Sequence, residues 1–206
     1  MKKLHTFTIG MFGIALGAFL LTACQGSGKK EETQETKKEE VSMNELTQKE
    51  KENGWMLLFN GKTPEGWRGY NKDSFPQAGW VIENGALQCI GSGQGEAGGK
   101  GGDIIYDKKF KDFKLQLEWK ISQGGNSGIF YLAKEIPDEP IWKSAPEMQI
   151  LDNKRHPDAE LGKNGNRKAG SLYDLIPADP QNAKPAGEWN QVEILVYQGT
   201  VVHKMN

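Results

Sequence analysis

The sequence predicts a domain built almost entirely of β-strands, a sandwich or a barrel, with one short helix at its beginning. Three observations support this fold class. Short segments rich in strand-forming residues recur from residue 55 onward, glycine, asparagine and proline separate them, and only one strong helix signal occurs. Many short strands with frequent turns are typical of sandwiches and barrels. Residues 47–206 are enough for one domain with its own core.

The helix is predicted to begin just after Thr47. Thr47 and Glu50 have the Thr-x-x-Glu spacing of a capping box, in which each side chain accepts a hydrogen bond from the backbone of the other residue. Gly54 can end the helix on its C-terminal side. We therefore expect a single short helix ahead of the strands.

The clearest strand signals come from a turn and from alternation. Asn84-Gly85, a pair most typical of a two-residue hairpin, separates predicted strands at residues 80–83 and 86–90. Residues 113–121 alternate between apolar and polar side chains, as in a sheet with one packed face. The other strands are predicted at residues 55–59, 103–106, 128–133, 147–151, 192–197 and 200–205.

The first 46 residues are predicted to lie outside the domain. Residues 1–23 have the charged start and the short apolar stretch of a signal peptide. Leu21-Thr22-Ala23-Cys24 resembles the lipobox of bacterial lipoproteins, in which the cysteine is acylated and becomes the new N-terminus. Residues 24–46 are dense in charge of both signs, so we expect a disordered tether. The expected protein is a lipoprotein of the cell envelope, anchored to the membrane through Cys24.

Charge and cysteine content narrow the range of partners. The 26 basic and 27 acidic side chains nearly balance and give no reason to expect a nucleic-acid partner. Cys89 has no second cysteine left to pair with once Cys24 carries lipid, so no disulfide is expected. Its place in a predicted strand indicates a small buried core residue.

Two other segments carry expectations. The glycine-rich residues 91–102 lack the strand–loop–helix context of a phosphate-binding loop, so they predict an ordinary flexible loop. The chain stops at Asn206, a residue type that favours the opening of a tight turn. A further strand is therefore expected after residue 206, and the chain is expected to be truncated.

The most informative segment is the predicted strand at residues 147–151, which carries polar side chains. Because side chains alternate along a strand, Glu147 and Gln149 share one face and Met148 and Ile150 take the other. A carboxylate beside an amide suits sugar hydroxyls, acid–base chemistry or a metal ion. This segment predicts a saccharide-active site.

Aromatic side chains could add to such a site. Six tryptophans are many for this length, and Trp67 and Trp142 lie in loops rich in glycine or proline. Each is a candidate for stacking on a sugar ring, although loop packing is the favoured interpretation because tryptophan is mostly buried in proteins.

Several motifs, taken in order, resemble the 3-keto-disaccharide hydrolase domain family over roughly residues 46–206. The resemblance implies a concanavalin-like jelly-roll sandwich and a lipoprotein of a sugar-degrading bacterium. The final hairpin and strands of the family are missing, which again predicts truncation. The matching motifs are Gly54-Trp55, Leu57-Leu58-Phe59-Asn60-Gly61-Lys62, Gly66-Trp67, Asn126-Ser127-Gly128-Ile129, Pro146-Glu147, Gln149-Ile150-Leu151-Asp152, Leu172-Tyr173-Asp174-Leu175 and Lys184-Pro185-Ala186-Gly187-Glu188-Trp189-Asn190.

The resemblance implies cleavage of 3-keto-glycosides. A 3-ketone acidifies the proton on the neighbouring carbon, a base removes it, and the enolate expels the glycosidic oxygen. Addition of water then completes a net hydrolysis. Such a route needs a base, an acid for the leaving oxygen and a group that stabilises the enolate oxygen.

The resemblance also implies roles for individual residues. Glu147 would be the base or a metal ligand, and Asp152 or His156 the acid or a second ligand. A divalent metal ion held by Glu147 and His156 belongs to this hypothesis. The remaining candidates, which would bind the substrate or stabilise the oxyanion, are Glu118, Asn126, Gln149, Arg155, Tyr173 and Lys204.

Two other functions stay open. Laminarinase-type retaining glycosidases carry a Glu-x-Asp-x-x-Glu strand, and Glu147, Gln149 and Asp152 have the same spacing, with departures at the last two positions. A jelly roll with a polar concave face also makes a non-catalytic glycan-binding module.

Overall fold

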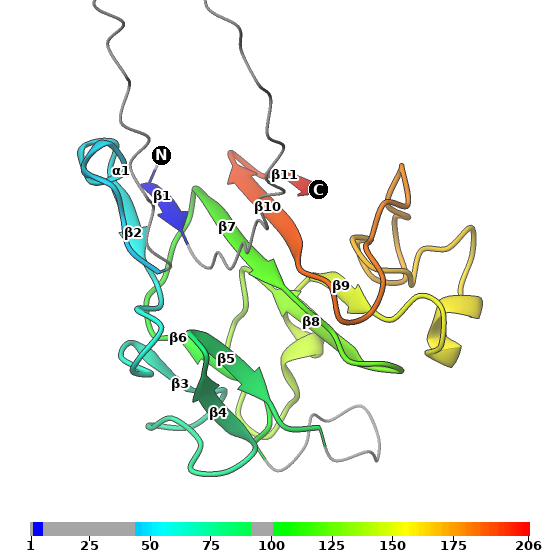
Figure 1. Cartoon of the computed structure of the whole chain (residues 1–206), viewed down its shortest axis with the longest axis horizontal. Helices are drawn as coiled ribbons and strands as arrows, with labels where there is room; N and C mark the ends of the chain where they lie inside the picture. Colours follow the sequence, from blue (N-terminus) through cyan, green and yellow to red (C-terminus); the bar gives the residue numbers. More distant parts are fainter. Residues whose placement is uncertain (1, 6–43, 92–100) are drawn as a thin grey trace, which may run out of the picture.

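The computed structural model describes residues 2–5, 44–91 and 101–206, and these residues form strands with almost no helix (Figure 1). This confirms the predicted all-β class with one short helix, α1 (Gln48–Glu52). The strands are β1 (Lys2–His5), β2 (Trp55–Leu57), β3 (Trp67–Gly69), β4 (Trp80–Glu83), β5 (Ala86–Cys89), β6 (Ile104–Tyr106), β7 (Phe113–Trp119), β8 (Asn126–Phe130), β9 (Glu147–Leu151), β10 (Asn190–Tyr197) and β11 (Thr200–Met205). Two short 3₁₀ helices are η1 (Ile141–Lys143) and η2 (Pro157–Glu160).

The predicted capping box opens α1. The backbone N–H of Thr47 donates to Oε2 of Glu50 at 2.8 Å, and the backbone N–H of Glu50 donates to Oγ1 of Thr47 at 3.3 Å. These bonds satisfy two amide groups that a helix start would otherwise leave unpaired. Gly54 follows with φ of +75°, a conformation that glycine adopts without strain.

The largest sheet has the strand order β11-β10-β7-β1-β2. β10 pairs antiparallel with both β7 and β11, and Ile194 lies opposite Leu115 and His203. β1, which falls within the predicted signal peptide, runs parallel to β7 on one side and to β2 on the other. An extended segment in this place satisfies the backbone groups along two strand edges at once.

Several sequence predictions fall outside the described residues. These are Cys24, most of the predicted signal peptide and tether, and most of the glycine-rich loop. Within residues 2–5, 44–91 and 101–206, no helix has the length and apolar character needed to cross a membrane.

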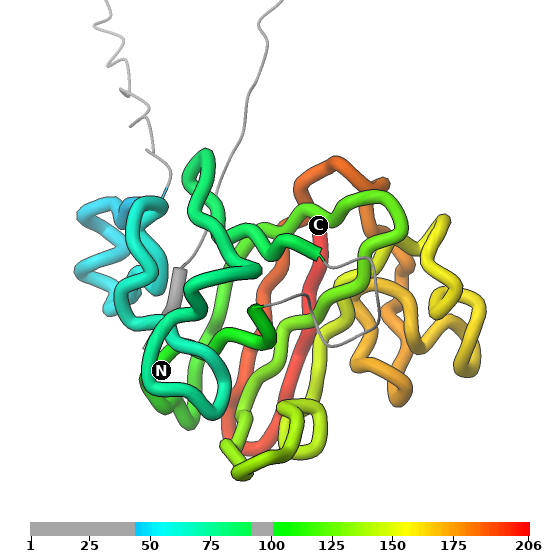
Figure 2. Tube along the Cα trace, turned by 90° about the horizontal axis from the view of Figure 1, so that it is seen from below, coloured from blue at the N-terminus to red at the C-terminus, as the bar shows by residue number. Residues whose placement is uncertain are grey.

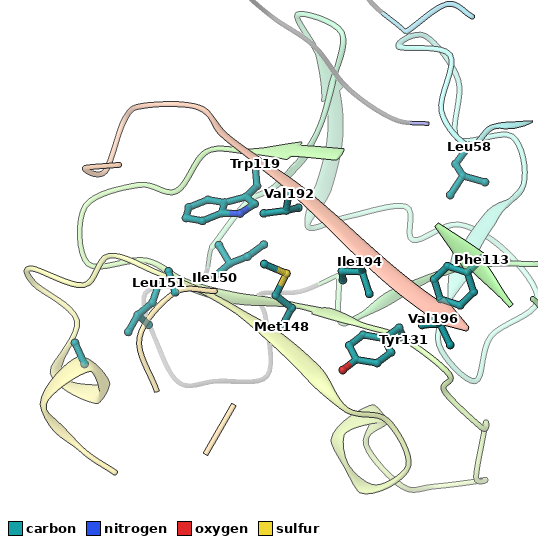
Figure 3. Packing of buried hydrophobic residues seen from close by; sticks show 12 residues of the cluster. Leu58, Phe113, Trp119, Tyr131, Met148, Ile150, Leu151, Val192, Ile194 and Val196 are labelled. Carbon is teal, nitrogen blue, oxygen red and sulfur yellow. The ribbon is translucent and has the colours of Figure 1, made fainter. Parts of the chain in front are cut away.

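The core lies between the largest sheet and the two-stranded β8–β9 sheet (Figure 3). Met148 and Ile150 of β9 point toward Val192 and Ile194 of β10, and all four side chains are buried. Full burial of one such side chain stabilises a fold by about 1.5–3 kcal/mol. The apolar face of β9 therefore packs on the core, and its other face is left for Glu147 and Gln149.

The remaining strands form two further two-stranded sheets, β3–β6 and β4–β5. Asn84 and Gly85 join β4 to β5 with φ of 50° and 74°, as the predicted tight hairpin requires. The expectation that Cys89 is a buried core residue is wrong, because its side chain is exposed at the end of β5. A hairpin with one solvated face offers no core at that position.

A long irregular segment joins β9 to β10. Residues 152–189 contain η2 but no further named strand, and they lie at the opposite end of the molecule from α1 (Figure 2). Residues 170–173 of this segment run beside β9: the N–H of Gly170 donates to the carbonyl oxygen of Gln149, and the N–H of Tyr173 to that of Glu147. The polar face of β9 is thus flanked by β8 on one side and by this segment on the other.

Candidate active site

The candidate site is the face of β8 and β9 that points away from the core. In the antiparallel register, Glu147 lies opposite Phe130 and Gln149 lies opposite Gly128. Alternation along each strand puts Asn126, Glu147 and Gln149 on this face, since Met148 and Ile150 point into the core. The face therefore brings together a carboxylate and two amides that the sequence singled out.

Burial changes across this face. Gln149 is buried, with 1% of its surface exposed, while Glu147 is half-buried and Asn126 is exposed. Nε2 of Gln149 donates to Oδ1 of Asn126 at 3.4 Å, and Oε1 of Gln149 accepts from the backbone N–H of Ile150 at 3.1 Å. A buried amide held at both ends is a fixed donor and acceptor rather than a mobile surface group.

Tyr173 joins the face from the segment beside β9. Its backbone N–H donates to the carbonyl oxygen of Glu147 at 3.0 Å, and its ring is half-buried. Its hydroxyl donates to Oδ2 of Asp158 at 2.9 Å. Because its hydrogen is engaged in that bond, the Tyr173 oxygen can meet a ligand hydroxyl as an acceptor.

Asp158 and Arg167 form a support for Tyr173 that sequence reasoning missed. Asp158 is 5% exposed, and its other oxygen, Oδ1, accepts from Nη1 of Arg167 at 2.9 Å. Arg167 also contacts Asp174 through Nε and lies 5.3 Å from the centre of the Tyr173 ring. The hydrogen bonds to Asp174 and Asp158 raise the pKa of Arg167 above its ordinary value, so the guanidinium stays charged. The only signal in the sequence is a weak one: an arginine, Arg167, seven residues before an acid, Asp174, in a polar loop.

Asp152 is placed as a turn residue. Its Oδ2 accepts from the N–H of Gly124 at 2.8 Å, its Oδ1 accepts from the N–H of Lys154 at 3.1 Å, and the residue is 3% exposed. The hydrogen bond from Gly124 lowers the pKa of Asp152 below its ordinary value. An acid held ionised in this way is poorly suited to give up a proton, so the predicted role of Asp152 as the acid does not fit its surroundings.

Arg155 and His156 lie in the loop that follows β9. Nη1 of Arg155 is 3.7 Å from Oδ2 of Asp152, and 47% of the Arg155 side chain is exposed. His156 is half-buried, and its Nδ1 accepts from the backbone N–H of Asp158 at 3.2 Å. His156 is therefore linked through Asp158 to the hydroxyl of Tyr173, and the other ring nitrogen, Nε2, carries the hydrogen when the ring is neutral.

The predicted metal site does not fit the residues present. Glu147 begins β9, whereas His156 lies in the loop beyond its other end and already uses Nδ1 as an acceptor. Across the described ranges, no group of three or more His, Cys, Asp or Glu side chains is arranged to hold a metal ion. No step of the chemistry is therefore assigned to a metal.

Glu118 and Lys204, which the sequence also singled out, do not join the candidate face. Glu118 accepts from Nε2 of Gln191 at 2.7 Å across β7 and β10. Lys204 lies 3.3 Å from Glu193 across β10 and β11, with 67% of its side chain exposed. Both point away from the face of the largest sheet that packs against β9, because Phe113, Trp119 and Ile194 occupy that inner face.

The two candidate tryptophans differ in environment. Nε1 of Trp67 donates to the carbonyl oxygen of Leu58 at 2.7 Å, and its ring meets Tyr106 edge-on at 5.5 Å beside the core. Trp142 is 61% exposed in η1, and Nζ of Lys143 lies 4.8 Å from the centre of its ring. Trp67 is thus a packing residue, whereas Trp142 keeps a ring face open to solvent.

The chain resembles known proteins over most of its length. It is 50% identical over 213 aligned positions to a 3-keto-disaccharide hydrolase of Bacteroides thetaiotaomicron, covering 93% of this chain and 73% of that protein. A crystal structure of a protein from Parabacteroides distasonis, assigned as a glycosyl hydrolase, is similar in fold with a TM-score of 0.67 and 32% identity. That match covers 79% of this chain and 73% of the other.

A second Parabacteroides distasonis structure with the same assignment gives a TM-score of 0.52 at 25% identity, over 73% of this chain and 61% of the other. Residues 54–206 match the model of one family, described as the 3-keto-alpha-glucoside-1,2-lyase-like domain. This match takes in β2 to β11 and every residue of the candidate face. The chain therefore belongs to the 3-keto-alpha-glucoside-1,2-lyase-like domain family.

Proposed function

We propose that this protein is a carbohydrate hydrolase that cleaves the glycosidic bond of 3-keto-glycosides, by elimination followed by addition of water. Membership of the family and the similarity to the 3-keto-disaccharide hydrolase of Bacteroides thetaiotaomicron support this substrate class. The observation that carries the proposal is the shared face of Glu147, Gln149 and Asn126, with Tyr173 at its side. It offers one carboxylate among hydroxyl-binding groups, which is what removal of an activated C–H proton requires.

In the proposed first step, Glu147 accepts the proton from the carbon next to the ketone. The electron pair of that C–H bond forms the enolate, and its return to carbon breaks the bond between the anomeric carbon and the glycosidic oxygen. The departing oxygen takes a proton, and the remaining sugar holds a carbon–carbon double bond conjugated with the ketone. Water then adds across that double bond, with its oxygen going to the anomeric carbon.

Supporting roles follow from the placement of the neighbouring groups. Asn126, held in place by the buried Gln149, would orient a sugar hydroxyl, and the oxygen of Tyr173 would accept a hydrogen bond from another. His156 is proposed as the acid for the departing oxygen: in its protonated form, which gives up the hydrogen bond from the N–H of Asp158, it donates the proton from Nε2 and becomes neutral. The exposed guanidinium of Arg155 is proposed to stabilise the enolate oxygen.

The laminarinase-type alternative is weakened by the position of Asp152. A retaining glycosidase needs two carboxyl groups about 5–5.5 Å apart on either side of the scissile bond. Asp152 is buried in a turn and bonded to the backbone of Gly124 and Lys154, so it does not join Glu147 on the open face.

One experiment separates the proposal from its alternatives. The protein is incubated with a 3-keto-glucoside and, separately, with the unoxidised parent glucoside, and the released sugars are quantified. Cleavage of the keto sugar alone is expected, cleavage of the parent would support the retaining glycosidase, and binding without cleavage would support a glycan-binding module. Glu147→Gln should abolish cleavage with an unchanged unfolding transition; an active Glu147→Gln would contradict the role of Glu147.

The envelope location is also proposed, from the lipobox at Cys24. Cys24→Ser should abolish incorporation of labelled fatty acid and release the protein from the membrane fraction. Cys89→Ser serves as the control, since Cys89 is exposed in the domain and far from the lipobox in sequence. Labelling of Cys24→Ser equal to that of the wild type would contradict the anchor.

A further inference from the structure

Gly128 is a glycine in the middle of a strand, and the backbone does not explain why. Its φ lies outside the left-handed region that favours glycine, so the conformation is open to any residue. A glycine inside a strand weakens it relative to a residue with a side chain, and it often marks a close approach of another group. The reason for glycine must therefore lie in what approaches Gly128.

The approaching group is the side chain of Glu147. A Cβ atom added to Gly128 would overlap Oε1 of Glu147 and would lie 2.5 Å from its Cδ and 2.6 Å from its Cγ. A Cβ atom does not make non-bonded contacts this short in proteins. The Glu147 side chain therefore occupies the space that any other residue at position 128 would need. The three atoms nearest to that position all belong to Glu147.

The register of β8 and β9 gives this contact a direction. Glu147 lies opposite Phe130, and Gly128 lies opposite Gln149. The Glu147 side chain thus reaches diagonally across the strand pair, a separation that long side chains can span. Its carboxylate comes to lie at the level of Gln149, which holds Asn126 by the 3.4 Å hydrogen bond.

We propose that Gly128 is a positioning residue: its missing side chain lets the Glu147 carboxylate lie flat across β8, beside Gln149. A larger residue at position 128 would push the carboxylate off the strand and away from the amides that orient the sugar. This inference rests on the proposed function for its catalytic meaning, although the contact between Gly128 and Glu147 does not.

The test compares Gly128→Ala with Gly91→Ala, which adds the same methyl group at a position where no atom of the described residues lies within 4 Å. Gly128→Ala is expected to lower kcat/KM for a 3-keto-glucoside by about 100-fold, since misplacement of a catalytic group by about 1 Å has an effect of that size. The acid limb of the pH profile of kcat/KM, which reports the ionisation of the base, is expected to move as well. An unchanged kcat/KM and pH profile in Gly128→Ala would overturn the proposal.

A stability cycle covers the other outcomes and needs no substrate. The Tm of the wild type, Gly128→Ala, Glu147→Ala and the double variant is measured. Gly128→Ala is expected to lower the Tm only when Glu147 is present. If Gly128→Ala does not fold, a folded double variant supports the proposal and an unfolded one overturns it. If the wild type cleaves no keto sugar, the proposed function fails, but the cycle still decides whether Glu147 occupies the space at Gly128. An equal change in Tm on Gly128→Ala in the wild type and in Glu147→Ala would overturn the inference.

Discussion

The hydroxyl of Tyr173 donates to Oδ2 of Asp158 at 2.9 Å, and the guanidinium of Arg167 binds the other oxygen of the same carboxylate at the same distance. Asp158 is 5% exposed; the Arg167 guanidinium balances its charge, and the Tyr173 hydroxyl donates to its second oxygen. The carboxylate fixes the direction of the Tyr173 hydroxyl. It also ties the loop that carries His156 to the segment that runs beside β9.

Asp158→Asn should destabilise the protein and weaken substrate binding. An amide cannot accept from both partners, so either the hydroxyl or the guanidinium loses its acceptor, at about 2 kcal/mol of unfolding free energy for a buried charged hydrogen bond. Denaturant unfolding measures the first effect, and KM for a 3-keto-glucoside measures the second. Asp174→Asn is the matched control, because Asp174 binds the same arginine from an exposed position. Equal losses in the two variants would contradict a special role for Asp158.

Trp67→Ala and Trp142→Ala should differ in their effect on the free energy of unfolding. Trp67 donates to the carbonyl oxygen of Leu58 and packs beside the core, so its loss should lower the free energy of unfolding by about 3 kcal/mol. Trp142 is 61% exposed, and its loss should leave stability nearly unchanged. Chemical denaturation of both variants measures this difference. A large stability loss in Trp142→Ala would mean that its ring packs in solution.

The charge cluster around Arg68 should make the free energy of unfolding decrease in acid. Arg68 contacts Glu135 through Nη1 at 2.6 Å and Asp107 through Nε at 2.9 Å. The hydrogen bond from Arg68 lowers the pKa of Glu135 from 4.5 to about 2. Since the unfolded carboxyl takes up its proton at higher pH than the folded one, this stabilisation is present above pH 4.5 and is lost as pH falls toward 2.

Glu135→Gln should therefore flatten the loss of stability in that acid range. The difference from the wild type at neutral pH is expected to be about 2 kcal/mol, after allowance for the 32% exposure of the Glu135 side chain. Urea unfolding at several pH values measures it. Asp107→Asn, which removes the more exposed partner of the same arginine, should keep most of the pH dependence. A Glu135→Gln profile parallel to that of the wild type would refute this assignment.

The strand at residues 147–151 shows which features of the site the alternation of side chains can predict. Its predicted bounds and the shared face of Glu147 and Gln149 match β9, because alternation along a strand is fixed by backbone geometry. Alternation does not say which way a polar face points. Glu118 and Lys204 also lie on polar faces, but theirs is the outer face of the largest sheet.

The parts that sequence could not predict depend on contacts between distant residues. Asp158, Arg167 and Tyr173 meet only because the segment after β9 folds back beside that strand. Gly128 could be counted as part of a motif, but its purpose needs the register between β8 and β9. The place of Cys89 in a predicted strand indicates a core residue, yet the β4–β5 hairpin leaves it exposed.

His203 should make stability depend on pH near neutrality. Nε2 of His203 lies 3.0 Å from the hydroxyl oxygen of Tyr131, and Nδ1 lies 3.4 Å from the carbonyl oxygen of Gly170, so the ring joins β11 to the segment beside β9. Burial lowers the pKa of His203 below its ordinary value of 6.5. The unfolded histidine therefore binds a proton at a pH where the folded one resists it. The contribution of His203 to the free energy of unfolding should be fully present above pH 6.5, and it should be lost as pH drops from 6.5 through the lower pKa of the folded state.

His203→Gln should remove this slope, which for one proton is at most about 1.4 kcal/mol per pH unit. Urea unfolding between about pH 7.5 and about pH 5 measures it, at pH values above the range in which Glu135 titrates. Tyr131→Phe is the control: it removes the hydroxyl partner but keeps the ring that packs edge-on against His203 at 5.5 Å, so the slope should remain. If His203→Gln and the wild type lose stability in parallel over this range, another group is responsible. A slope that disappears only in His203→Gln would assign it to this histidine, because burial of the ring, rather than its contact with Tyr131, is the first cause of the lowered pKa.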